Sequence, residues 1–179
     1  MSDMQQQLDE LMARTADIIA EAGHKASKSD GDGSWYFAPS GDYYRHVFVR
    51  DGLFVLGQVD RANPEREVFA SENPRDMELF MTFWLCSNWR SQHNLPRLLT
   101  VPVPVTPDKA APGFVIEREG RSWVLKEPAT GVERRSSDDS GLVRFSYFVT
   151  MSPEELRAAC MAPEGKPPFF PWAQLARRN

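Results

Sequence analysis

Apolar side chains recur every three or four residues over two long stretches of the chain, the spacing that lines one face of an α-helix. The first stretch predicts a helix over residues 3–22, which stops at Gly23 because glycine readily adopts the left-handed conformation of a helix end. The second predicts a helix with Asn73 as N-cap and Pro74 at the first helical position, continuing to about Ser91. The second helix is the more apolar of the two, so we expect it to be the better buried.

Apolar and polar residues alternate over several short segments between these two helices, as they do in antiparallel strands. Tyr43–Arg50 alternates most clearly, and Leu53–Val59 is predicted to return beside it. The Asp51-Gly52 pair between them suits a two-residue hairpin, in which both residues take positive φ angles. Ser34–Ala38 and Glu67–Ala70 complete a predicted antiparallel meander.

The strand pattern resumes in the second half of the chain. Residues 96–112 come first; they are rich in proline but too apolar for a free linker, so we expect a packed crossover. Strands are then predicted at residues 113–117 and 123–126. A short edge strand is predicted at residues 132–135 and a long strand at residues 141–150.

The C-terminal region begins with a capping box, because Glu155 stands three residues after Ser152, and this predicts a short helix to about Met161. The tail is expected to dock through its rings, which are Phe169, Phe170 and Trp172. The whole chain, residues 1–179, is thus predicted to be one α+β domain. It combines antiparallel sheet of about seven to eight short strands with two main helices and one short helix.

Composition narrows the possible partners. The formal charge is −4, and the basic runs Arg134-Arg135 and Arg177-Arg178 are short, so we expect no nucleic-acid partner. Cys86 and Cys160 are expected to be free thiols in a reducing compartment. The N-terminus lacks the pattern of a signal peptide, and no apolar run approaches the ~20 residues of a membrane span. We therefore expect a cytoplasmic protein without a membrane partner.

Candidate chemistry is sparse. No motif for a bound nucleotide, a catalytic serine or a zinc-dependent hydrolase occurs in the sequence. His24, His46 and His93 lack the spacing of metal ligands. Asp30–Gly33 looks like the start of a calcium loop, but Trp35 occupies the position where that loop requires glycine. The sequence therefore predicts no catalytic residue, no cofactor and no metal.

Several short segments along most of the chain carry a family likeness, and the most telling is Arg90-Ser91 followed by Leu95-Pro96 after an aromatic helix. The other segments are Glu21–Gly23, Tyr43–Leu56, Glu67–Phe69, Asp76–Trp89, Pro112–Phe114, Trp123–Leu125 and Leu142–Tyr147. In these segments the chain resembles the bacterial immunity protein family that includes the immunity factor of the tuberculosis necrotizing toxin.

The resemblance implies a non-enzymatic antitoxin without a cofactor. Its partner would be one cognate secreted toxin, bound one-to-one, whose NAD glycohydrolase active site the immunity protein blocks. The polar loops at residues 24–34 and 127–141 would suit a plug for that site. Acidic groups there would meet a site shaped for phosphates and speed the encounter. The candidate toxin-interface residues are Asp30, Asp32, Trp35, Asp138 and Asp139.

Three other functions stay open at this point. A secretion chaperone or adaptor would bind an effector without silencing it. A small enzyme would need dispersed polar residues, such as His46 with acidic neighbours, to meet in one pocket. A structural subunit would expose a large apolar patch and self-associate.

Overall fold

The computed structural model describes residues 3–40, 43–60, 63–100 and 105–171. In chain order, a helix and a strand meander are followed by a long central helix and then by shorter strands and helices. The elements are α1 (Asp3–Glu21), β1 (Ala26–Lys28), β2 (Trp35–Ser40), β3 (Tyr43–Arg50), β4 (Leu53–Asp60), β5 (Asn63–Ser71), α2 (Pro74–Gln92), β6 (Leu98–Leu99), the 3₁₀ turn η1 (Pro107–Lys109), β7 (Val115–Glu119), β8 (Ser122–Glu127), β9 (Val132–Ser136), α3 (Asp139–Ser146), α4 (Pro153–Met161) and β10 (Phe170–Pro171).

The strands form one large antiparallel sheet in the order β1-β2-β3-β4-β5-β9-β8-β7, and β6 pairs with β10 in a separate two-stranded sheet. The predicted α+β class with an antiparallel sheet is confirmed. The position predicted for residues 132–135 is wrong, because β9 is not an edge strand. It pairs along its length with β8 and, through Ala70↔Arg135 and Ser71↔Arg134, joins the N-terminal meander to the C-terminal hairpin.

The long strand predicted at residues 141–150 is also wrong, because this segment begins within helix α3 and continues in turns. Apolar residues occupy both faces of the segment, so a period of two and a helical period fit it equally well. The N-cap formed by Asp138 favours the helix over the strand. Its side chain accepts hydrogen bonds from the backbone N–H groups of Ser140 and Gly141, which caps α3.

The predicted starts and turns with a local chemical signature are confirmed. The side chain of Asn73 caps α2, and the Ser152–Glu155 capping box caps α4. Asp51 and Gly52 have φ angles of 53° and 77°, as the β3–β4 hairpin requires. In the tail, Phe169 is buried and Phe170 is exposed. Part of the crossover, residues 101–104, and the tail from residue 172 lie outside the described residues.

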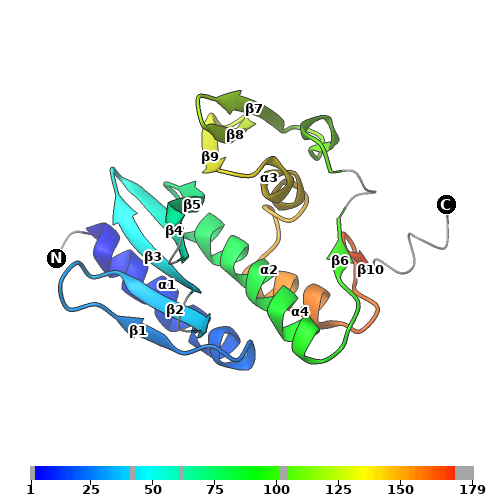
Figure 1. Cartoon of the computed structure of the whole chain (residues 1–179). Coiled ribbons are helices and arrows are strands. Elements are labelled where there is room, and N and C mark those ends of the chain that lie inside the picture. Colours follow the sequence, from blue (N-terminus) through cyan, green and yellow to red (C-terminus); the bar gives the residue numbers. More distant parts are fainter. Residues whose placement is uncertain (1–2, 41–42, 61–62, 101–104, 172–179) are drawn as a thin grey trace.

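Helix α2 runs through the middle of the molecule, between the N-terminal meander and the C-terminal elements (Figure 1). It contacts α1, α4, β4 and β5, which explains why its first half is buried almost all round. The core joins residues of α1, the inner face of the sheet, α2, α3 and α4. The expectation that α2 is better buried than α1 is confirmed.

Two buried arginines hold these parts in place. Arg134 on β9 donates from Nε to Asp76 Oδ2 at 2.7 Å, which ties the sheet to the start of α2. Arg90 near the end of α2 donates to the carbonyl oxygens of Pro96, Cys160, Ala162 and Pro163 at 2.7–2.9 Å. Helices leave their last carbonyls without internal partners, so Arg90 satisfies the end of α4 and fixes the crossover beside it.

Candidate functional site

Two of the sequence-predicted interface residues, Asp30 and Asp32, lie exposed in the turn between β1 and β2. The carboxylate of Asp32 accepts a hydrogen bond from the backbone N–H of Ser34 at 3.0 Å. That bond, helped by Ser29, lowers the pKa of Asp32. The turn therefore presents a fixed negative charge to solvent at neutral pH.

Trp35, the third candidate, is held against α1. Its indole Nε1 donates to Asp9 Oδ1 at 2.9 Å, and Lys28 binds the other oxygen of Asp9 at 2.6 Å. The Lys28 ammonium lies 5.9 Å from the centre of the Trp35 ring. Trp35 thus joins β2 to α1 and is half-buried by this role.

The remaining two candidates, Asp138 and Asp139, stand at the start of α3, far along the sheet order from the β1–β2 turn. The polar loop expected at residues 127–141 is in fact a tight turn, strand β9 and a helix start. Both oxygens of Asp138 are engaged in the cap of α3. The structure does not bring the five candidates together, and their place in an interface stays a prediction.

A groove with a cavity volume of about 750 Å³ opens where the sheet, α2 and α3 meet. One wall comes from the inner faces of β3, β4 and β5, and the floor from α2. The other wall comes from the start of α3 and from the segment that leads from α2 into β6. The residues that line the groove include Arg45, Gln58, Arg66, Phe80, Phe83, Trp84, Arg90, Arg97, Leu99, Asp138 and Arg144.

The groove is strongly basic although the chain as a whole carries a charge of −4. Five arginines line it, and Asp138 is the one acidic residue among its lining residues. Arg90 donates its hydrogen bonds to backbone carbonyl oxygens, and the Asp138 carboxylate accepts the hydrogen bonds that cap α3. Four guanidinium groups, each from a different element or segment, are left to set the potential of the groove.

Arg45 is the most buried of the four, with 8% of its surface exposed. Its guanidinium carbon lies 4.0 Å from the centre of the Trp84 ring, and its Nη2 donates to Tyr43 Oη and Gln58 Oε1. Its Nη1 is buried and has no hydrogen-bond partner. Burial lowers the pKa of Arg45, the hydrogen bond to Tyr43 raises it, and the neighbouring Arg66 cation lowers it further.

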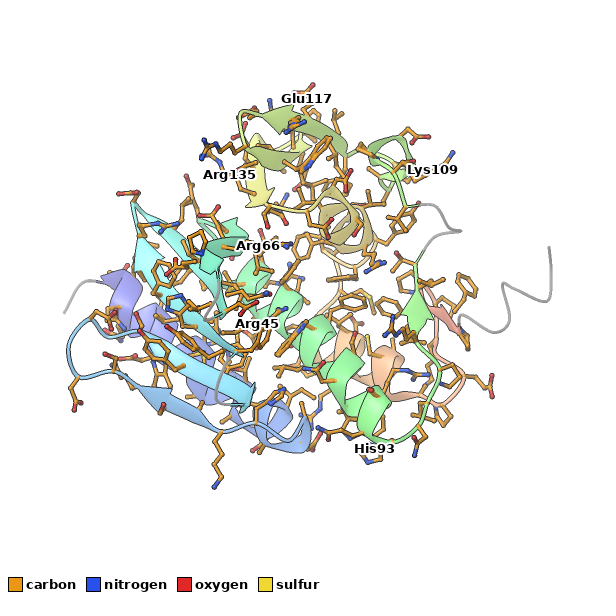
Figure 2. All side chains as sticks on the ribbon, viewed as in Figure 1. Arg45, Arg66, His93, Lys109, Glu117 and Arg135 are labelled. Atoms are coloured by element: carbon orange, nitrogen blue, oxygen red, sulfur yellow. The ribbon has the colours of Figure 1, made fainter. Side chains whose placement is uncertain are left out.

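The other three arginines are less constrained. Arg66 is exposed and donates from Nε to Ser137 Oγ at 2.7 Å, and Figure 2 shows it on the same side of the meander as Arg45. Arg144 is half-buried, and its Nε has no partner. Arg97 is exposed. Within the described ranges, Arg45, Arg66, Arg97 and Arg144 make no ion pair with a carboxylate.

The groove is not predicted from the sequence because its arginines are dispersed along the chain. One signal was present. Arg45 lies on the same side of β3 as Val47, the side that packs toward the core, where a charged residue is unusual. A charge on an inward-facing strand position indicates either a buried ion pair or a lined cavity.

Metal-ligand clusters and membrane-spanning helices were looked for among the described residues. No group of three or more His, Cys, Asp or Glu side chains there is arranged to hold a metal ion. Of the helices in these ranges, none combines the length and the apolar character that a membrane span needs. Arginine guanidinium groups bind carboxylates and phosphates, so the groove is suited to an anionic ligand.

Comparison with known proteins adds two findings. A family model described as Immunity protein 61 matches residues 18–168. Among solved structures, Rv3902c from M. tuberculosis matches with a TM-score of 0.77 and 22% sequence identity, covering 89% of this chain and 94% of that chain. At this identity the structural likeness establishes the fold alone. Comparison with curated proteins gives no match.

Proposed function

The chain belongs to the Immunity protein 61 family, and on this premise we propose that it binds a cognate toxin and keeps it inactive in the cell that makes both. The family match carries the proposal, because it extends over residues 18–168 and so includes the sheet, α2, α3 and α4. A protein of this kind acts through its surface. The groove and the β1–β2 turn offer charged surfaces of opposite sign for such a partner.

We propose further that the toxin is an NAD glycohydrolase, that the complex is one-to-one and that the chain covers the toxin's active site. The resemblance to the immunity factor of the tuberculosis necrotizing toxin supports this assignment. The chain would need no cofactor and no catalytic residue, because it works by excluding NAD from the toxin.

Co-expression with the product of the adjacent gene tests the proposal. We expect a stable one-to-one complex by size-exclusion chromatography with light scattering, and we expect the complex not to consume NAD. A complex that still consumed NAD would identify a chaperone or adaptor instead. Turnover of a small metabolite by the purified chain alone would indicate an enzyme and contradict the proposal.

The exposed acidic turn between β1 and β2 is a proposed contact with the toxin's phosphate-binding site. Asp30→Ala is the direct test, since Asp30 is exposed. Asp17→Ala, on the exposed face of α1, is the matched control because it removes the same charge. We expect slower association for Asp30→Ala, and equal association rates for both variants would remove this turn from the interface.

A further inference from the structure

We propose that the basic groove receives an acidic segment of the partner toxin, whose carboxylates bind the guanidinium groups of Arg45, Arg66, Arg97 and Arg144. The identity of the partner rests on the proposed function. The groove itself, its charge and its chemistry are properties of this chain.

The four groove arginines differ from many other cations of the described chain, which have carboxylate partners. Arg134 binds Asp76 and Glu127, Arg157 binds Glu21, and several further Lys and Arg side chains also have carboxylate partners. The described residues supply no such partner for the four groove arginines. Asp138 is the one carboxylate among the groove's lining residues, and it is engaged in the cap of α3, so the positive charge of the groove is left without a counter-ion from the described residues.

The environment of Arg45 also favours an anionic occupant. Its guanidinium is buried among the groove's lining residues without a carboxylate partner, and a carboxylate placed in the groove would offset this desolvated charge by Coulomb attraction. The Trp84 ring and the Tyr43 hydroxyl already hold the guanidinium in position. Binding would thus cost little further ordering of this side chain.

The layout of the groove favours an extended acidic segment over a single small anion. The four arginines come from β3, from β5, from the segment before β6 and from α3, so their charges are spread along the walls. A phosphate ion would use one or two of them. The apolar side chains that line the groove, which include Phe80, Phe83 and Leu99, suit the aliphatic parts of Glu and Asp side chains and their neighbours.

Charge reversal of the two exposed groove arginines provides the test. The double variant Arg66→Glu/Arg97→Glu changes positions that are not part of the core. Its matched control is Arg118→Glu/Arg121→Glu, which makes the same charge change at exposed positions at the β7–β8 turn, outside the groove. Circular dichroism melting curves of both variants establish that they fold.

Calorimetric titration with the purified toxin then measures affinity. We expect the groove variant to bind roughly 30-fold or more weakly and the control to stay within about twofold of the unaltered chain. We also expect a Glu or Asp to Lys exchange in the toxin's acidic segment to restore binding to the groove variant. Equal affinity of the groove variant and its control would overturn the proposal.

Two further outcomes are informative. Titration of the chain alone with inorganic phosphate and with citrate asks whether a free anion uses the groove. Tight binding of either, with toxin affinity unchanged in the groove variant, would assign the groove to a small ligand and contradict the proposal. Absence of any complex between the unaltered chain and the toxin would instead refute the proposed function and, with it, the toxin as occupant.

Discussion

Replacing Arg90 by methionine removes the donor that four backbone carbonyl groups share. Arg90 is 2% exposed, and its three guanidinium nitrogens bind Pro96 O, Cys160 O, Ala162 O and Pro163 O. Cys160 lies in the last turn of α4, Ala162 and Pro163 follow that helix directly, and Pro96 lies in the segment that follows α2. Methionine keeps most of the aliphatic length, so the variant isolates the loss of the hydrogen bonds from the loss of packing.

The loss in the free energy of unfolding depends on which of the four carbonyl oxygens water can reach in the variant. The bond to Cys160 O is buried, so this oxygen loses its partner completely, at a cost of roughly 1–3 kcal/mol. The other three bonds are partly buried, so water replaces the donor in part, and each costs about 0.5–1 kcal/mol. We expect a total loss of about 2.5–6 kcal/mol in the free energy of unfolding, a large share of a typical domain's stability.

Urea unfolding followed by tryptophan fluorescence measures this loss, with Arg157→Met as control. Arg157 makes one ion pair with Glu21 at 2.6 Å, and both side chains are more than one-third exposed. The same substitution there should cost less than about 1 kcal/mol. If Arg90→Met were no more destabilising than Arg157→Met, the assignment of Arg90 as the link between α2, α4 and the crossover would be wrong.

Three further predictions concern other parts of the fold. Gly57→Ala places a Cβ against the His46 ring, which lies over β4, and should cost about 1–3 kcal/mol in thermal unfolding. Asp76→Asn leaves the buried Arg134 guanidinium without its main counter-ion and should cost about 3–5 kcal/mol by urea unfolding, whereas Glu133→Gln, at an exposed pair, should have little effect. Burial, with the Arg45 cation, lowers the pKa of His24 below 6.5, so its contribution to stability is present above pH 6.5 and is lost as the pH falls. Urea unfolding between pH 7.5 and pH 5 should show this loss, and His24→Gln should reduce it; an unchanged pH dependence in the variant would contradict the role given to His24.

Local chemistry explains which parts of the fold could be predicted from the sequence. Asn73 and the Ser152–Glu155 box cap their helices through bonds within three residues, and Asp51-Gly52 sets a hairpin through its own φ angles. These caps and turns involve only residues that are close in the sequence, so the local sequence is sufficient to predict them.

The strand prediction for residues 141–150 was wrong because the structure of this segment is set by distant contacts. Its apolar residues satisfy either period, and the outcome depends on packing against distant elements. Phe145 lies on Phe69 at a ring distance of 5.0 Å, and Ser146 accepts from the backbone N–H of Ala111 at 2.8 Å. Those partners are far away in sequence, so no local pattern identifies them. The pairing of β9 with β5 was missed on the same grounds.

The groove, like α3, depends on contacts between residues far apart in the sequence. The interface predicted from the sequence lies in acidic loops, whereas the groove is basic and contains buried guanidinium nitrogens without hydrogen-bond partners. Both surfaces can contact the same toxin. An acidic β1–β2 turn and a basic groove, lying on different parts of the sheet, form a charge pattern that matches a partner in one orientation and repels the reversed one. Two separate contacts predict an additive result. The loss of binding free energy for Asp30→Ala combined with Arg66→Glu/Arg97→Glu should equal the sum of the two separate losses, whereas a toxin that contacts only one of the two surfaces would leave one of the changes without effect.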